Sequence, residues 1–180
     1  MAEDRRGRQT PTTSFILPYR ETKGAEAIEL YNRTGRTAQE WQELLVYDIL
    51  AVNEDGLWTH TKFGYSIPRR NGKNEVVAIR ELYGLFHGER ILHTAHRTTT
   101  SRSAWERLCN LLVKLGVKEE KYNVSDGFKT GKSKGQEFIE LCEELGGGRI
   151  DFRTRTTTGG LGEGFDLLVI DEAQECQTDQ

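Results

Sequence analysis

The 180-residue sequence has little cysteine, no long apolar run and no apolar leader. Its three cysteines, Cys109, Cys142 and Cys176, lie far apart and form no Cys-x-x-Cys pair, which argues against a disulfide framework and a zinc site. No apolar run approaches the roughly 18 residues that span a bilayer. The charged segment 1–10 also lacks the apolar core of a secretory signal. These absences predict a cytoplasmic protein with reduced thiols, no membrane span and no structural metal.

Charge is unevenly distributed along the chain, whose net charge is −3. Such a balance argues against a protein that simply coats nucleic acid. Residues 62–107 contain nine Lys or Arg against four Asp or Glu, whereas residues 163–180 contain six acids and no bases. A basic zone followed by an acidic zone suits a site that holds a polyphosphate and a divalent cation between them. Two solvated surfaces would give the same pattern.

Helical and strand periodicities alternate through the middle of the chain. They predict an α/β fold whose mainly parallel sheet is flanked by helices, with an inserted β-hairpin at 136–142 and 149–154 around a Gly-rich turn. Residues 1–24 are predicted to be a polar arm, residues 25–180 one domain, and residues 118–135 a loop. Thr37 is the predicted N-cap of the first helix. The predicted helices are 37–52, 73–87 and 100–116, and the remaining strands are 57–67, 90–95 and 165–170.

A phosphate-binding candidate lies where the predicted strand 57–67 gives way to a helix, in the segment Ile67-Pro68-Arg69-Arg70-Asn71-Gly72-Lys73-Asn74. The start of a helix presents backbone N–H groups and the positive end of the helix dipole to an anion. Gly72 would allow close approach of the backbone, and Lys73 would reach the β- and γ-phosphates. Arg69 and Arg70 add positive charge beside them.

The segment departs in two places from the phosphate-loop pattern GxxxxGK[ST]. Ile67 stands at the first glycine, and Asn74 stands where a Ser or Thr would bind Mg²⁺. Asn74 could offer its amide oxygen to the metal, directly or through water. By pattern alone, an ordinary basic turn fits the same residues.

A second Gly-Lys pair occurs at Gly131-Lys132-Ser133, four residues after Gly127. No apolar strand leads into it, and residues 134–136 continue into strand-like sequence instead of an amphipathic helix. Without a strand-to-helix junction the backbone cannot form a phosphate cradle. This pair is therefore predicted to lie in a flexible basic loop.

The acidic candidate is Asp166-Leu167-Leu168-Val169-Ile170-Asp171-Glu172-Ala173-Gln174. Four consecutive apolar residues that end in two carboxylates indicate a buried parallel strand with charge at its carboxyl end. Asp171 would hold Mg²⁺, and Glu172 would polarise the water that attacks the γ-phosphate. The alternative is an acidic helix start that is stabilised by the helix dipole.

The two candidates reinforce each other through their spacing. Lys73 and Asp171 are 98 residues apart in the sequence. This interval leaves room for a strand between the two site strands, as the additional-strand (RecA-like) class of P-loop ATPases requires. Kinase-type P-loop proteins lack a catalytic Glu after the Asp, so Glu172 favours a motor or a helicase.

Taken in order, these segments resemble the ATPase domain of large terminase subunits, which pump DNA into tailed-phage heads. The likeness covers residues 37–176 and includes Gln39-Glu40-Trp41-Gln42, the variant Walker A at 67–73, Leu92-His93-Thr94-Ala95, the hairpin and Arg/Thr/Gly loop at 136–158, and the Walker B at 168–174. The resemblance implies ATP and Mg²⁺ as ligands. Carried over by residue, it makes Gln42 an adenine contact, Arg70 and Lys73 phosphate contacts, Asp171 the metal ligand and Glu172 the catalytic base, whereas Asn74 stands where the family also prefers Ser or Thr. Together with the turn itself, the predicted site residues are Gln42, Arg69, Arg70, Asn71, Gly72, Lys73 and Asn74 for the nucleotide, Asp171 and Asn74 for the metal, and Glu172, Lys73 and Arg70 for catalysis.

The resemblance also implies partners and a place of action. A packaging ATPase would act on double-stranded DNA with a small terminase subunit and a portal, as a homo-oligomeric ring in the host cytoplasm. Lys129, Lys132 and Lys134 could contact DNA, although a solvated loop is the favoured interpretation of these residues. Motors of this kind commonly complete the ATP site with an arginine of a neighbouring subunit.

Departures from the family pattern keep two alternatives open. The loop Thr158-Gly159-Gly160-Leu161-Gly162 lacks the arginine that relatives often carry there, and Arg153 or Arg155 could replace it or be solvated strand residues. The family continues with a coupling motif and a nuclease domain, so the chain is expected to be a fragment that is incomplete at its C-terminus. A DExx helicase-like ATPase and an inactive nucleotide-binding fragment remain the alternative functions.

Overall fold

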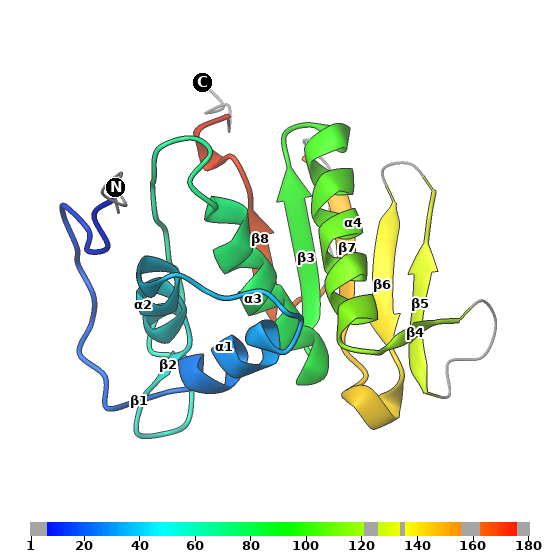
Figure 1. Ribbon diagram of the computed structural model, residues 1–180, viewed down its shortest axis with the longest axis horizontal. Coiled ribbons are helices and arrows are strands. Elements are labelled where there is room, and N and C mark those ends of the chain that lie inside the picture. Colours follow the sequence, from blue (N-terminus) through cyan, green and yellow to red (C-terminus); the bar gives the residue numbers. More distant parts are fainter. Residues whose placement is uncertain (1–6, 121–125, 134–135, 156–162, 176–180) are drawn as a thin grey trace, which may run out of the picture.

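The computed structural model describes residues 7–120, 126–133, 136–155 and 163–175. Helices and strands alternate along most of this length (Figure 1). The helices are α1 (Gly24–Asn32), α2 (Glu40–Ile49), α3 (Lys73–Phe86) and α4 (Thr98–Lys114), with single 3-10 turns at Glu143–Leu145 and Ala173–Glu175. The strands are β1 (Glu21–Thr22), β2 (Ala51–Val52), β3 (Arg90–Ala95), β4 (Lys118–Glu119), β5 (Gly127–Gly131), β6 (Glu137–Leu141), β7 (Arg149–Thr154) and β8 (Leu167–Ile170).

Six strands form the main sheet in the order β4-β5-β6-β7-β3-β8. Strand β3 is parallel to both of its neighbours, β7 and β8, and β4 is parallel to β5. Strands β5, β6 and β7 pair antiparallel with one another. The fold is therefore α/β with a mostly parallel sheet, and an antiparallel hairpin is inserted before the last strand.

Helices α3 and α4 pack against the same face of this sheet (Figure 1). Alternation along the strands explains the choice of face, because successive side chains point to opposite sides. Ile91 and His93 of β3 stand in register with Ile150 and Phe152 of β7, and all four are buried. On β8, Leu167 and Val169 pack against the same core, whereas Leu168 and Ile170 are about half exposed on the other face.

Helices α1 and α2 pack against α3, on the far side from α4. The start of α2 is closed by a capping box in which Gln39 and Gln42 bond each other's backbone N–H groups. Strand β1 pairs with β2, which begins directly after Leu50 at the end of α2. Near this pair, the hydroxyl of Tyr19 donates to Asp48 (2.8 Å). None of the helices in the described ranges has the length and hydrophobicity needed to cross a bilayer.

The helices at 73–87 and 100–116, the strands at 90–95 and 165–170, and the hairpin at 136–154 are confirmed within a few residues. The helix predicted at 37–52 is shorter, because Gln39 and not Thr37 caps it and residues 51–52 form β2. Helix α1 was not predicted. The loop predicted at 118–135 is wrong in part, since 127–131 form β5, whose Phe128 is fully buried.

The strand predicted at 57–67 is wrong. Only Trp58 makes a β-bridge, to Val52, and the rest of this segment has no backbone ladder among the described residues. A strand needs a neighbour that pairs its backbone groups. The main sheet ends at β8, and a groove lined by β8 and by this segment lies between the two. Partial alternation of apolar residues therefore did not suffice to make a strand. The strand-to-helix junction predicted at Gly72 is wrong for the same reason, since a loop leads into α3 and only the helix start is present.

Candidate functional site

The turn that leads into α3 is built around Gly72. This residue is the N-cap of the helix and has φ +81°, a left-handed conformation that glycine adopts without strain. A Cβ at this position would come within 3.0 Å of the Gln42 amide nitrogen, which donates to the carbonyl of Gly72 (3.3 Å). Asn71 steadies the same turn, because its side chain donates to the carbonyls of Pro68 and Arg69 (3.1 Å each).

Arg69 and Arg70 are exposed at this turn, and Arg70 has φ +65° although it is not a glycine. The backbone N–H groups of the first turn of α3 follow these two arginines. Such groups have no partner within the helix. The fold therefore gathers three sources of positive potential, namely the helix start, the two arginines and Lys73.

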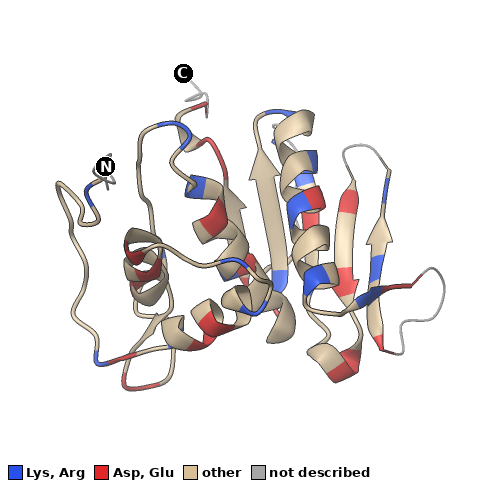
Figure 2. Ribbon diagram, viewed as in Figure 1, with Lys and Arg blue, Asp and Glu red and all other residues tan. Residues whose placement is uncertain are grey.

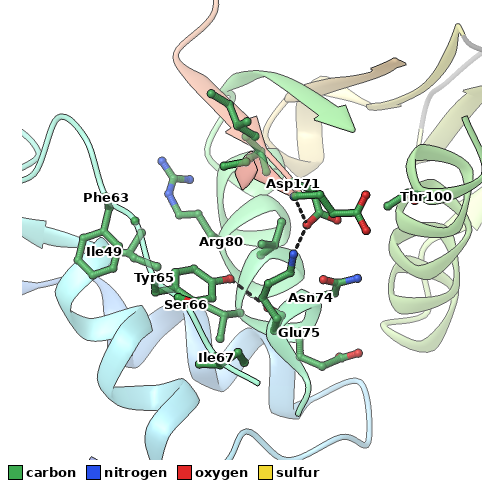
Figure 3. A pocket seen from close by; sticks show the side chains of 18 of the residues that line it. Ile49, Phe63, Tyr65, Ser66, Ile67, Asn74, Glu75, Arg80, Thr100 and Asp171 are labelled. Atoms are coloured by element: carbon green, nitrogen blue, oxygen red, sulfur yellow. Dashed lines mark hydrogen bonds and ion pairs between the residues drawn. The ribbon is translucent and has the colours of Figure 1, made fainter. Parts of the chain in front are cut away.

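Lys73 reaches across the site and donates to the carboxylate of Asp171. In Figure 3 this contact is the dashed line that joins an amino group to the labelled Asp171. The two residues are 98 positions apart in the sequence. The Asp171 side chain is 4% exposed and that of Lys73 is 33% exposed, so the pair lies at the inner end of an open groove. The fold thus brings together the phosphate-binding candidate and the acidic candidate of the sequence.

The tip of β8 positions the two carboxylates. The backbone N–H of Asp171 donates to the carbonyl of Thr94 on β3 (2.9 Å), which carries the sheet pairing to the end of the strand. Glu172 then turns with φ +54°, and its N–H donates to the Asp171 carboxylate (2.8 Å). Among the described residues, Arg70 and Glu172 are the two non-glycine residues with positive φ, and both lie at this site. Such strain persists where the surrounding structure imposes it, often at functional sites.

A groove of about 1780 Å³ connects these parts. Its walls are the segment 60–73, the start of α3, and the whole of β8 with its tip. Arg97, Thr100 and Arg107 of the β3–α4 loop and α4 close the third side. Figure 2 shows basic residues before α3 and before α4, on either side of the acidic tip of β8. This charge distribution matches an anion that is bound together with a cation.

A smaller cavity of about 580 Å³ lies on the other side of the turn and is lined by Gln42, Arg70, Asn71, Gly72 and Glu75, among others. At its floor, Glu75 is bound by Tyr31 (2.5 Å) and Arg36 (2.7 Å). Burial and the hydrogen bond to Glu75 raise the pKa of Tyr31 to about 12, so this hydroxyl remains a donor. Gln42, which was predicted to contact the adenine, lies beside this turn. Its amide oxygen accepts from the N–H of Gln39, and its amide nitrogen donates to the carbonyl of Gly72.

Sequence reasoning missed Tyr65 and Glu75. The hydroxyl of Tyr65 donates to the backbone carbonyl of Lys73 (3.0 Å), which ties the segment 57–67 to the start of α3 (Figure 3). Burial, followed by the charge of Asp171, raises the pKa of Tyr65 well above its ordinary value. Neither residue belongs to a recognisable motif, and their partners are read only from the fold.

Other residues predicted to be functional are placed as follows. Asn74 lies in the first turn of α3 and lines the groove near Asp171 (Figure 3). Lys129 pairs with Glu140 (2.6 Å) and Lys132 pairs with Glu119 (2.8 Å), and the described part of the second Gly-Lys segment contains no helix start. Lys134 and the loop 158–162 lie outside the described residues. In the described ranges, no three His, Cys, Asp or Glu side chains gather as a metal cluster.

Comparison with protein-family models, with curated proteins and with solved structures gave no match to this chain.

Proposed function

We propose that this chain binds and hydrolyses ATP as the P-loop ATPase domain of a DNA-packaging motor of the large-terminase type. The observation that carries the proposal is the contact between Lys73 and Asp171, which joins the turn at a helix start to the carboxyl end of a parallel strand. A lysine and an aspartate in these positions serve the phosphate and metal sites of P-loop ATPases.

The residues present fit a triphosphate and Mg²⁺. The start of α3, Lys73 and the exposed Arg69 and Arg70 would bind phosphate oxygens. Asp171 would hold Mg²⁺, with Asn74 as a second oxygen ligand; Mg²⁺ commonly takes one or two protein groups beside phosphate and water. Bound there, the metal would neutralise charge on the phosphate oxygens.

Glu172 would act on the attacking water. Its carboxylate follows Asp171 directly and lines the same groove, where it would orient a water molecule and accept its proton. On the opposite side, Gln42 would hold the turn through the carbonyl of Gly72 while it lines the smaller cavity, a candidate place for the base.

The motor assignment rests on the resemblance and is the finer part of the proposal. It implies double-stranded DNA as the cargo, a small subunit and a portal as partners, and a ring of subunits in the host cytoplasm. Because such motors commonly complete the site with a neighbour's arginine, we expect weak ATP turnover by the isolated chain. Rapid hydrolysis by a monomer would contradict the motor assignment.

The experiment that tests ATP binding measures thermal unfolding with and without ATP·Mg²⁺. A ligand that binds the folded state at about 100 times its Kd stabilises it by about 2.7 kcal/mol, so we expect a clear rise in Tm for the wild type. Lys73→Ala should abolish the rise. Lys132→Ala is the matched control, because Lys132 also follows a glycine but lies between β5 and β6, away from the groove. No rise at millimolar nucleotide, or an equal rise with Lys73→Ala, would show that the phosphate site is misassigned.

A further inference from the structure

Arg155 makes a contact that the nucleotide site as described does not use. It follows β7, and its backbone N–H donates to the carbonyl of Ala95 at the end of β3 (3.0 Å). From there its guanidinium crosses the end of β3 and reaches the tip of β8. Nη1 donates to the carbonyl of Asp171 (2.7 Å) and Nη2 to the carbonyl of Glu172 (3.0 Å).

This contact joins the carboxyl ends of three adjacent strands, since the sheet order is β7-β3-β8. The planar guanidinium matches two neighbouring carbonyl groups, and a charged donor makes stronger hydrogen bonds than a neutral one. Arg153, two residues earlier and within β7, instead forms a two-pronged pair with Glu163 (2.8 and 3.0 Å). The side chain of Arg155 therefore contacts the tip of β8, whereas that of Arg153 is bound to Glu163.

The backbone that Arg155 holds is strained. Glu172 has φ +54°, a left-handed conformation that is unfavourable for a non-glycine residue and persists only where its surroundings impose it. The directions of both carboxylates depend on this turn, because Asp171 and Glu172 are its consecutive residues. Among the described residues, Arg155 is the side chain that bonds both of their carbonyls.

We infer that Arg155 is a positioning residue, which fixes the turn at the tip of β8 and so aims Asp171 at the metal and Glu172 at water. The inference rests on the proposed ATP site. It assigns Arg155 a role within its own subunit and through the backbone, so that its charge is engaged by carbonyl groups and does not bind phosphate.

The test measures ATP affinity with and without Mg²⁺ for the wild type, Arg155→Ala, Arg155→Lys and Arg153→Ala. Loss of a group that orients a metal ligand typically lowers metal affinity by about 10- to 100-fold. We therefore expect Arg155→Ala to lower the Mg²⁺-dependent gain in ATP affinity at least about tenfold, with metal-free ATP affinity changed less than about twofold. Arg155→Lys should recover part of the gain, because an ammonium group cannot bond both carbonyls in the same fork geometry. Arg153→Ala should match the wild type.

Three results would overturn the inference. One is an unchanged Mg²⁺ effect in Arg155→Ala. Another is an equal loss of ATP affinity with and without Mg²⁺, which would place Arg155 on the phosphates. In the third, the wild type binds no ATP in either condition; this outcome is distinct because it refutes the proposed function as well.

A second measurement needs no nucleotide and covers a variant that is poorly stable. Glycine accepts the left-handed turn without strain. Arg155→Ala should therefore reduce the folding equilibrium constant about tenfold in the wild-type background and less than about threefold in the Glu172→Gly background, a coupling that a double-mutant cycle reports. Equal reductions in the two backgrounds would show that Arg155 does not act through this turn.

Discussion

The turn before α3 and the tip of β8 face each other across the candidate site but are held in different ways. The turn exposes Arg69 and Arg70, and side-chain bonds from Asn71 and Gln42 support it. The tip of β8 ends a strand that is paired with β3 and packed against the core. The comparison shows that the carboxylates depend on the sheet, whereas Lys73 depends on a helix start and a few local contacts.

We expect the largest loss of stability from a substitution that breaks a buried pair beneath β3 and β8. His93 of β3 is in register with Val169 of β8, and its Nδ1 lies 2.5 Å from Glu81 of α3, with both side chains 2% exposed. Breaking a buried pair leaves one partner unsatisfied and costs about 3–5 kcal/mol. We expect this loss in Glu81→Ala, measured by chemical denaturation.

An exposed pair of the same two residue types provides the control. His87 and Glu26 are 3.0 Å apart, with side chains 37% and 56% exposed. Glu26→Ala should cost less than about 1 kcal/mol. If the two variants lose the same stability, then burial of the pair of His93 and Glu81 adds nothing to its contribution.

A smaller effect is expected from pH at the same buried pair. Burial lowers the pKa of His93. The charge of Glu81 and the hydrogen bond to it raise the pKa by more than burial lowers it, so the net shift is upward from 6.5. A raised pKa in the folded state gives stability that is full below the unfolded value and is lost as pH rises through the folded value. The free energy of unfolding should therefore fall above pH 6.5, and His93→Gln should weaken this dependence.

Denaturation curves at a series of pH values above and below 6.5 test this expectation. Glu26→Ala should keep the wild-type slope, because it leaves the buried pair of His93 and Glu81 intact. A free energy of unfolding that rises over the same pH range would contradict the predicted direction.

The turn side is tested by two glycines with the same conformation. Gly72 has φ +81° and Gly35 has φ +80°, but a Cβ would meet Gln42 only at position 72, with open space at position 35. Substitution by alanine should cost each variant about 1–2 kcal/mol from backbone strain. Only Gly72→Ala should also weaken ATP binding, which a nucleotide titration would show. If Gly72→Ala and Gly35→Ala change ATP affinity equally, then Gly72 is not part of the nucleotide site.

The sheet side could be predicted from the sequence, because its signals are local. Four apolar residues before Asp171 and Glu172 predicted β8, and two strand-like segments around a Gly-rich turn predicted the hairpin of β6 and β7. The prediction that β8 is buried was wrong for one face, because β8 is an edge strand on which Leu168 and Ile170 are about half exposed. The start of α3 at Lys73 was also predicted, from its apolar face.

The turn side could be predicted only in part, because its contacts are distant in the sequence. The segment 57–67 has the alternation of a strand but lacks a pairing neighbour, and Tyr65 holds it to Lys73 instead. Glu75 is bound by Arg36 and approached by Arg107, residues that no local pattern connects. Tertiary contacts of this kind override propensity and become visible only in the folded chain.

The effect of Mg²⁺ on ATP affinity tests whether the contact between Lys73 and Asp171 marks a phosphate and metal site. Asp171→Asn removes the carboxylate that would hold the metal, and Asp166→Asn is the matched control just before the other end of β8, where Asp166 accepts from the N–H of Arg90 (2.8 Å). We expect Mg²⁺ to raise the ATP affinity of the wild type and of Asp166→Asn, and to raise that of Asp171→Asn at least about tenfold less. An undiminished effect of Mg²⁺ in Asp171→Asn would contradict the account.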